Sequence, residues 1–226
     1  MRKTITGLYV DTETGGLDPQ LHALTSICVG SFVLYPDQEP EIESFYASIC
    51  PIPALIVTDK ALQVQGITRA SLWASPRVLE KDALGDLSYW LWNEGQIWQL
   101  PIWAHNADFD RGFLSAACDR YHPGWHKASG HQLATTNLSV CALAGRDARW
   151  NCTRYLAEKL VTQGRLELPR KADGVGSVSL DPLMERLGIA GRVGAGHDAH
   201  EDVRLGVTVL DRLLRLDGWW DDEMQT

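Results

Sequence analysis

Short apolar runs separated by turn residues mark the first part of the chain. Residues 5–10 are apolar and β-prone and lead straight into Asp11-Thr12-Glu13, which predicts a buried strand ending in two carboxylates. Residues 24–35 and 42–49 are rich in β-branched and aromatic side chains and predict two more strands. Because short turns connect the three strands, the pattern indicates an antiparallel meander.

Helical spacing of apolar residues takes over in the second half of the chain. Apolar residues recur about every fourth position in the segments 79–91, 109–121 and 203–214, and 153–161 also predicts a helix. A further helix is expected from Ser179, which suits an N-cap, to Gly188, which suits a C-terminal stop. A short apolar strand is expected at 100–104. Strands followed by alternating helices and strands predict a mixed-sheet α/β domain.

The composition is that of an ordinary globular protein. The chain has 226 residues, of which 45% are hydrophobic and 22% are charged, and this excludes a disordered protein. We therefore expect one domain over residues 1–226, with an acidic C-terminal tail at 217–226. No apolar run approaches the roughly 20 residues of a membrane span, so we expect no membrane partner.

Cysteine usage and net charge narrow the classes of protein further. The 5 cysteines include no C-x-x-C pair, which indicates reduced thiols and a cytoplasmic protein. The net charge of -8 disfavours a protein that coats nucleic acid by phosphate neutralisation alone. Metal-dependent phosphate chemistry stays open, because acidic side chains can hold cations that in turn contact phosphate.

Asp11 and Glu13 form the first candidate site. Side chains two apart on a strand point to the same face, so the two carboxylates would repel each other unless a cation lay between them. The alternative is a solvated strand end. A bare D-x-E pattern is weak in a chain with 29 acidic residues.

Two further motifs lie where helices are expected to begin. The run Asn106-Ala107-Asp108-Phe109-Asp110 opens a helix, so its polar side chains either cap that helix or serve chemistry. His197 precedes Asp202 by five positions after a glycine-rich stretch, and the alternative there is the polar start of a surface helix. Each motif is weak alone, but their order and their places at element edges make the combination specific.

The combination resembles the DEDDh, or DnaQ-like, 3′→5′ exonuclease superfamily, which has an RNase H-like fold. VDTETGGLDP is similar to the first motif of that family, AHNADFDRGFL to the second and HDAHEDVRLGVTVL to the third. The resemblance spans residues 5–214. It implies a mixed β-sheet, made of a three-stranded antiparallel meander plus parallel strands, flanked by helices.

The resemblance also implies a role for each motif residue. Two divalent metal ions, Mg²⁺ or Mn²⁺, would be held by four carboxylates: Asp11, Glu13, Asp110 and Asp202. His197 would be the general base, whereas its rival His200 lacks the five-residue offset to Asp202. The reaction would hydrolyse the terminal phosphodiester of single-stranded DNA at a free 3′ end and release a nucleoside 5′-monophosphate.

Substrate contacts follow more loosely from the resemblance. Thr14, Gly15 and Leu17 resemble the part that receives the 3′-terminal nucleotide, with a plain turn as the alternative. Asn106 would hydrogen-bond near the substrate or cap its helix. A binding groove should also offer an aromatic ring for base stacking, and the candidates are Phe109, Trp125 and Trp150.

Two segments look like inserted material relative to the family, at 123–134 and 164–177. The second holds Arg165, Arg170 and Lys171, a basic cluster that would guide a nucleic acid backbone or would be a solvated loop.

Two other functions stay open. In the RNase T and oligoribonuclease branches of the family the substrate is the 3′ end of RNA, and the sequence does not discriminate RNA from DNA. The other alternative is a non-catalytic accessory subunit of a replication or repair complex, which predicts loss of a motif residue, yet all five are present. The resemblance also raises a homodimer as an expectation, although no sequence feature supports it.

Overall fold

The computed structural model describes residues 4–74, 76–93, 100–128, 132–133, 138–145, 148–168, 177–194 and 196–220. The strands are β1 (Ile5–Thr14), β2 (Leu24–Leu34), β3 (Glu41–Cys50), β4 (Val78–Leu79), β5 (Ile102–Ala104) and β6 (Trp150–Cys152). The α-helices are α1 (Asp59–Gln65), α2 (Glu80–Asn93), α3 (Ala107–Tyr121), α5 (Ser139–Ala144), α6 (Thr153–Thr162), α7 (Leu180–Arg186) and α8 (Ala199–Asp217). Short 3₁₀ turns are η1 (Ala70–Trp73) and η3 (Trp125–Lys127).

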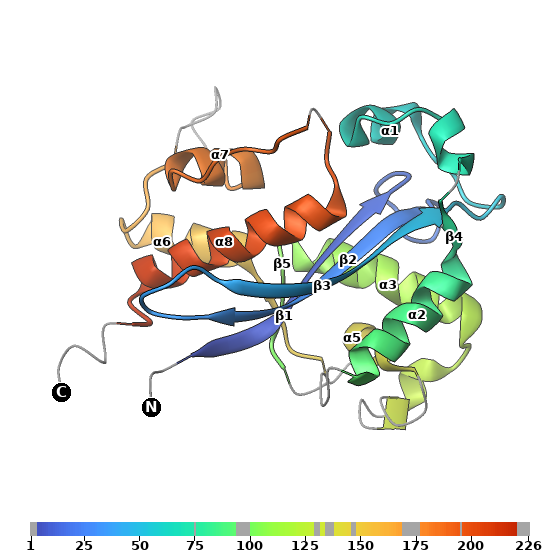
Figure 1. Cartoon of the computed structure of the whole chain (residues 1–226), viewed down its shortest axis with the longest axis horizontal. Coiled ribbons are helices and arrows are strands. Elements are labelled where there is room, and N and C mark those ends of the chain that lie inside the picture. Colours follow the sequence, from blue (N-terminus) through green and yellow to red (C-terminus); the bar gives the residue numbers. More distant parts are fainter. Residues whose placement is uncertain are drawn as a thin grey trace.

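A mixed β-sheet lies at the centre of the molecule (Figure 1). Within the described residues it has six strands in the order β4-β3-β2-β1-β5-β6. The first three strands pair antiparallel, as the meander predicted, and the short strands β4, β5 and β6 join in parallel. With helices on its faces, this sheet confirms the predicted α/β fold with a mixed sheet.

The two faces of β1 point into different cores. Leu8 packs in a core with residues of α2, α3 and α5, whereas Tyr9 packs against α8 on the opposite side. In Figure 1, α8 runs across one side of the strands while α2 and α3 lie on the other. Because side chains alternate along a strand, Asp11 and Glu13 share the α8 side with Tyr9, and Thr12 faces α3.

A glycine allows α8 to approach β1 closely. A Cβ added at Gly206 would lie 2.3 Å from the ring of Tyr9, so a larger residue would force the helix away from the sheet. The Tyr9 hydroxyl is 3.3 Å from the Thr153 hydroxyl at the start of α6. Asp202 lies about one turn before Gly206, and the close packing therefore brings its carboxylate to the end of β1.

The boundary expected for the first strand was wrong in one respect. β1 continues through Thr14 because Asp11 and Glu13 pair with Cys28 and Ser26 of β2, so both carboxylates lie within a strand and not beyond its end. The predicted helices are present as α2, α3, α6, α7 and α8.

The first residues of the expected C-terminal tail at 217–226 contact the rest of the protein. Asp217 is the last residue of α8, and its carboxylate accepts a bond from Lys159 Nζ at 2.8 Å. Trp220 packs against the cluster that contains Tyr9. Residues 221–226 lie outside the described residues. In the described part of the chain, no helix has the length and apolar character needed to cross a membrane.

Candidate active site

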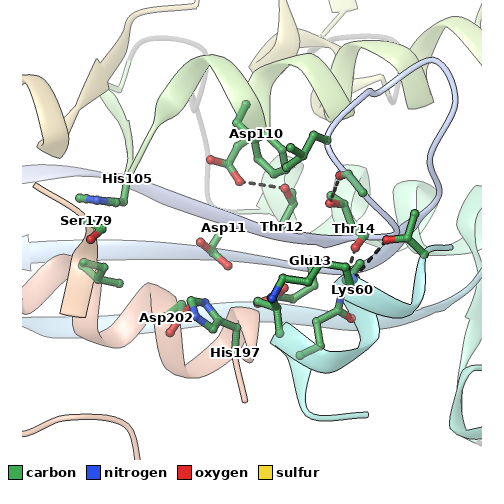
Figure 2. A pocket seen from close by; sticks show the side chains of 18 of the residues that line it. Asp11, Thr12, Glu13, Thr14, Lys60, His105, Asp110, Ser179, His197 and Asp202 are labelled. Carbon is green, nitrogen blue, oxygen red and sulfur yellow. Dashed lines mark hydrogen bonds and ion pairs between the residues drawn. The ribbon is translucent and has the colours of Figure 1, made fainter. Parts of the chain in front are cut away.

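Among the described residues, the C-terminal half of β1 has no strand paired to it on the β5 side. β5 pairs with β1 only at Leu8 and Tyr9, so the parallel pairing has ended before Asp11. The N-terminal ends of α3 and α8 carry the second and third motifs to this part of the strand. A cavity of about 500 Å³ lies here, with walls from β1, α1, α3, α8 and the residues before α7 and α8 (Figure 2).

All five side chains that the sequence motifs singled out line this cavity: Asp11, Glu13, Asp110, His197 and Asp202. In Figure 2, Asp11 lies between Asp110 and Asp202. One ligand atom from each of Glu13, His197 and Asp202 falls within 4.8 Å of the others. The fold thus brings together residues from three distant parts of the chain.

Asp110 reaches the cavity from the first turn of α3. Its carboxylate Oδ1 accepts a 2.8 Å bond from the Thr12 hydroxyl, which points to the α3 side of β1. Asn106 occupies the N-cap position with φ of 79°, and its side chain makes no capping bond. Burial raises the pKa of Asp110 to about 7, although the bonds from Thr12 oppose that rise.

The carboxylates of β1 also favour their protonated forms. Burial and the nearby charges of Asp110, Glu13 and Asp202 raise the pKa of Asp11 well above its ordinary value. Burial and the charge of Asp202 raise the pKa of Glu13 to about 7. Crowded carboxylates of this kind ionise readily only beside a cation. An all-oxygen donor set suits a hard divalent ion, so the residues fit the Mg²⁺ or Mn²⁺ that the resemblance implies.

The pKa of Asp202 shifts downward instead, because two side chains donate hydrogen bonds to its carboxylate. Arg192 Nε and Nη2 lie 2.6 Å and 3.0 Å from its two carboxylate oxygens, and His197 Nδ1 lies 3.2 Å from Oδ2. Burial alone would raise the pKa of Asp202, but the hydrogen bonds from His197 and Arg192 bring it below its ordinary value. The same contact with Asp202 raises the pKa of His197.

Several residues of the site were missed by the sequence analysis. Arg192 lines the cavity and lies in no recognised motif. His105 also lines it, with Nδ1 3.0 Å from the Thr153 hydroxyl, and burial lowers its pKa to about 4, so this ring is neutral. Gln65 of α1 donates to the Thr14 carbonyl at 2.8 Å. His105 directly precedes Asn106 in the second motif, and this position could have indicated that it belongs to the site.

The residues expected to receive a nucleotide divide into two groups. Thr14 and Leu17 line the cavity, and Leu17 is 84% exposed. Gly15 is buried outside the lining, where its N–H donates to the Ala23 carbonyl at 2.7 Å and its carbonyl accepts two bonds from Thr58. Gly15 therefore holds the loop in place and does not face the cavity.

The other expected substrate contacts are Asn106 and three aromatic side chains. Asn106 is exposed and outside the cavity lining, and its side chain does not cap α3, whereas a contact with substrate stays a prediction. Of the three aromatic candidates, Phe109 lines the cavity. Trp125 is buried in the core with α2 and α3, and Trp150 Nε1 donates to the Leu143 carbonyl at 2.7 Å.

The basic cluster predicted in 164–177 is only partly described. Arg165 Nη1 lies 3.1 Å from the backbone carbonyl of Asp217, at the C-terminal end of α8. The cavity is at the N-terminal end of this helix, so Arg165 is remote from it by about 20 Å at 1.5 Å per residue. Arg170 and Lys171 lie outside the described residues.

Comparison with solved structures shows the fold of the chain: it is the RNase H-like α/β fold of the exonuclease I structures. The chain is similar to exonuclease I from Methylocaldum szegediense, with 18% identity and a TM-score of 0.62 over 95% of this chain and 42% of that chain. Escherichia coli exonuclease I in complex with a dT13 oligonucleotide gives 18% identity and a TM-score of 0.62, over 93% and 41%. A product-bound exonuclease I gives 16% identity and a TM-score of 0.64, over 96% and 46%.

The chain therefore spans less than half the length of these proteins. By sequence, no family model and no curated protein matches it. At identities of 16–18% this likeness concerns the fold.

Proposed function

We propose that the protein is a metal-dependent 3′→5′ exonuclease of the DEDDh type that shortens single-stranded DNA. The observation that carries this proposal is the convergence of Asp11, Glu13, Asp110, His197 and Asp202 in one cavity. The fold supports it, since similar structures are exonucleases, one of them bound to a dT13 oligonucleotide.

The four carboxylates are the groups that would hold divalent ions. Asp11 and Glu13 come from β1, Asp110 from α3 and Asp202 from α8, so three rigid elements fix their geometry. Two such ions supply charge neutralisation at the phosphate and stabilise the attacking and leaving oxygens. The raised pKa values of Asp11, Glu13 and Asp110 are consistent with this role, because these side chains otherwise repel one another.

His197 is suited to accept the proton of the attacking water. Its Nδ1 lies 3.2 Å from Asp202, which orients the ring and leaves Nε2 as the nitrogen that exchanges a proton. The water oxygen forms the new bond to phosphorus while the bond to the 3′ oxygen of the preceding nucleotide breaks. The products are a nucleoside 5′-monophosphate and a strand shorter by one nucleotide.

The apolar part of the cavity is suited to a base. Leu17, Val64 and Phe109 line it beside the carboxylates, and Lys60 from α1 adds a cation for a phosphate. None of these contacts depends on which base is present, as an enzyme that removes successive nucleotides requires.

The function is tested with a single-stranded DNA oligonucleotide labelled at its 5′ end. With Mn²⁺ or Mg²⁺ we expect a ladder of products that shortens stepwise, and EDTA should abolish it. A 3′-labelled strand should lose its label in the first step. Immediate release of a labelled mononucleotide from the 5′ end would contradict the direction, and degradation of only a matched RNA would contradict the substrate. No cleavage of either strand would leave the accessory-subunit alternative.

Replacing Gly196 by alanine is expected to lower the cleavage rate about 100-fold, because small misplacements of a catalytic group have effects of this size. A Cβ at this position would lie 2.2 Å from the Gln65 carbonyl oxygen, and the next residue donates from His197 N to the Val64 carbonyl at 3.0 Å. The substitution thus moves His197 away from α1. Rates at saturating Mn²⁺ measure the effect.

Gly194→Ala is the matched control, since a Cβ there would have no atom within 4 Å. We expect this variant to cleave at the wild-type rate. Equal rates for the Gly196 and Gly194 variants would show that the contact with α1 does not position His197.

A further inference from the structure

A half-buried arginine is bound to the carboxylate that the proposed function assigns to a metal ion. The guanidinium of Arg192 bridges both oxygens of Asp202, with Nε at 2.6 Å and Nη2 at 3.0 Å. The side chains are 9% and 5% exposed, so water competes little for the contact. Nη1 of the same guanidinium also contacts Asp181 on α7.

This contact and a metal ion require the same oxygens. Each oxygen of Asp202 accepts a charged hydrogen bond from Arg192, and Oδ2 also lies beside His197 Nδ1. Two-pronged bonds between arginine and carboxylate are among the strongest that side chains form. A divalent ion at Asp202 would also repel the guanidinium directly, so the two cations exclude each other.

The chain on either side of Arg192 lies at the surface. Arg192 lies in the connection between α7 and α8, where Val193 is 95% exposed and a Cβ at Gly191 or Gly194 would have no atom within 4 Å. Asp181, with a side chain 62% exposed, lies at the outer side of the contact. Asp181 is therefore the anionic partner of Arg192 on the solvent side, and Asp202 is its partner on the buried side.

We propose that Arg192 is a built-in counter-cation of Asp202 that competes with the divalent ion for this carboxylate. In the metal-free protein it neutralises Asp202, and the ion enters at this carboxylate as the guanidinium moves toward Asp181. Arg192 thereby sets the metal concentration at which the site fills. The inference rests on the proposed function in one point only, that Asp202 is a metal ligand.

Arg192→Gln tests the proposal, because glutamine removes the charge and keeps a shorter, polar side chain. A calorimetric titration with Mn²⁺ should show that this variant binds the ion at least about tenfold more tightly than wild type does. In EDTA the melting temperature should fall, since Asp202 has lost its partner, and Mn²⁺ should raise it by more than in wild type. A purely structural role would lower the melting temperature and leave the Mn²⁺ affinity unchanged.

Arg186→Gln is the matched control, because this arginine is half-exposed on α7 and its carboxylate partner Glu167 lies 3.8 Å away. It should bind Mn²⁺ as wild type does. Should Arg192→Gln fail to fold, Arg192→Lys answers the same question: a lysine keeps the charge but cannot bridge both oxygens, so binding should tighten several-fold.

An unchanged or weaker Mn²⁺ affinity in these variants overturns the proposal. The titration needs no nucleic acid, so its result is separate from the proposed function. If the wild-type protein cleaves DNA and the Arg192 variants bind Mn²⁺ with unchanged affinity, the role of Arg192 is refuted and the proposed function stands. If the wild-type protein binds Mn²⁺ but cleaves neither DNA nor RNA, the proposed function is refuted and the role of Arg192 is unaffected.

Discussion

Asparagine in place of Asp11 should reduce DNA cleavage about a thousandfold or more while it makes the metal-free protein more stable. The loss of cleavage follows from the loss of a carboxylate at the centre of the cavity, where preorganised charge supplies most of the rate. The gain in stability follows because Asp11 is buried beside Asp110, Glu13 and Asp202, whose charges raise its pKa. Few substitutions are expected to change the two quantities in opposite directions.

The stability gain depends on pH in a defined direction. A carboxyl with a raised pKa in the folded state still holds its proton at a pH where the unfolded chain, with a pKa of about 4, has lost it. Between these two pKa values, each such group lowers the free energy of unfolding by up to about 1.4 kcal/mol for each unit that the pH rises. Asparagine removes this dependence for one group. In EDTA, urea unfolding should show equal stability near pH 4 and a more stable Asp11→Asn variant at pH 7.

Asp108→Asn is the matched control for this experiment. Asp108 is an exposed carboxylate on the first turn of α3, two residues before Asp110, and it does not line the cavity. Its replacement should leave cleavage unchanged and give no gain of stability at pH 7. If Asp11→Asn cleaves DNA at the wild-type rate, Asp11 is not a metal ligand of the reaction.

Alanine in place of His197 should slow cleavage by about 100- to 10,000-fold, the usual contribution of a general base. The structure also offers another reading, because His197 lies with Glu13 and Asp202 at distances that suit a shared metal ion. Mn²⁺ titration separates the two roles. A base leaves the affinity for Mn²⁺ largely intact when it is removed, whereas a ligand lowers it together with the rate.

His200→Ala is the control for position and for residue type. His200 lies on the first turn of α8 with its ring 5.9 Å from that of Tyr46, and it does not line the cavity. Its loss should leave the rate unchanged. A comparable drop in both histidine variants would remove the assignment of His197 as the base.

The placement of the motif carboxylates could be predicted because it depends on local periodicity. Alternation along a strand puts Asp11 and Glu13 on one face whatever the rest of the fold does. The spacing of apolar residues likewise places Asp110 and Asp202 at the starts of helices that pack on the sheet. These features require only neighbours in sequence, and the structure contains each of them.

Contacts between distant segments could not be predicted in the same way. The bond between Thr12 and Asp110 joins residues 98 positions apart, and it forms because Thr12 faces α3. Arg192 meets Asp202 because of the path of the connection between α7 and α8, which no periodic pattern describes. The helix α1, with 7 residues, is too short to show a clear amphipathic repeat, so the wall that it gives the cavity was missed.

The alternation of side chains along β1 also protects the folding of the chain. A slip of one residue against β2 would turn Asp11 and Glu13 into the core beneath α2 and α3, and would bring Leu8 against α8. Burying carboxylates there without partners costs several kcal/mol each, by rough account, which is much of the stability of a small domain. A chain with this error of strand pairing is therefore expected to stay unfolded. It can then refold or be degraded, and it does not persist as a compact molecule with a defective cavity.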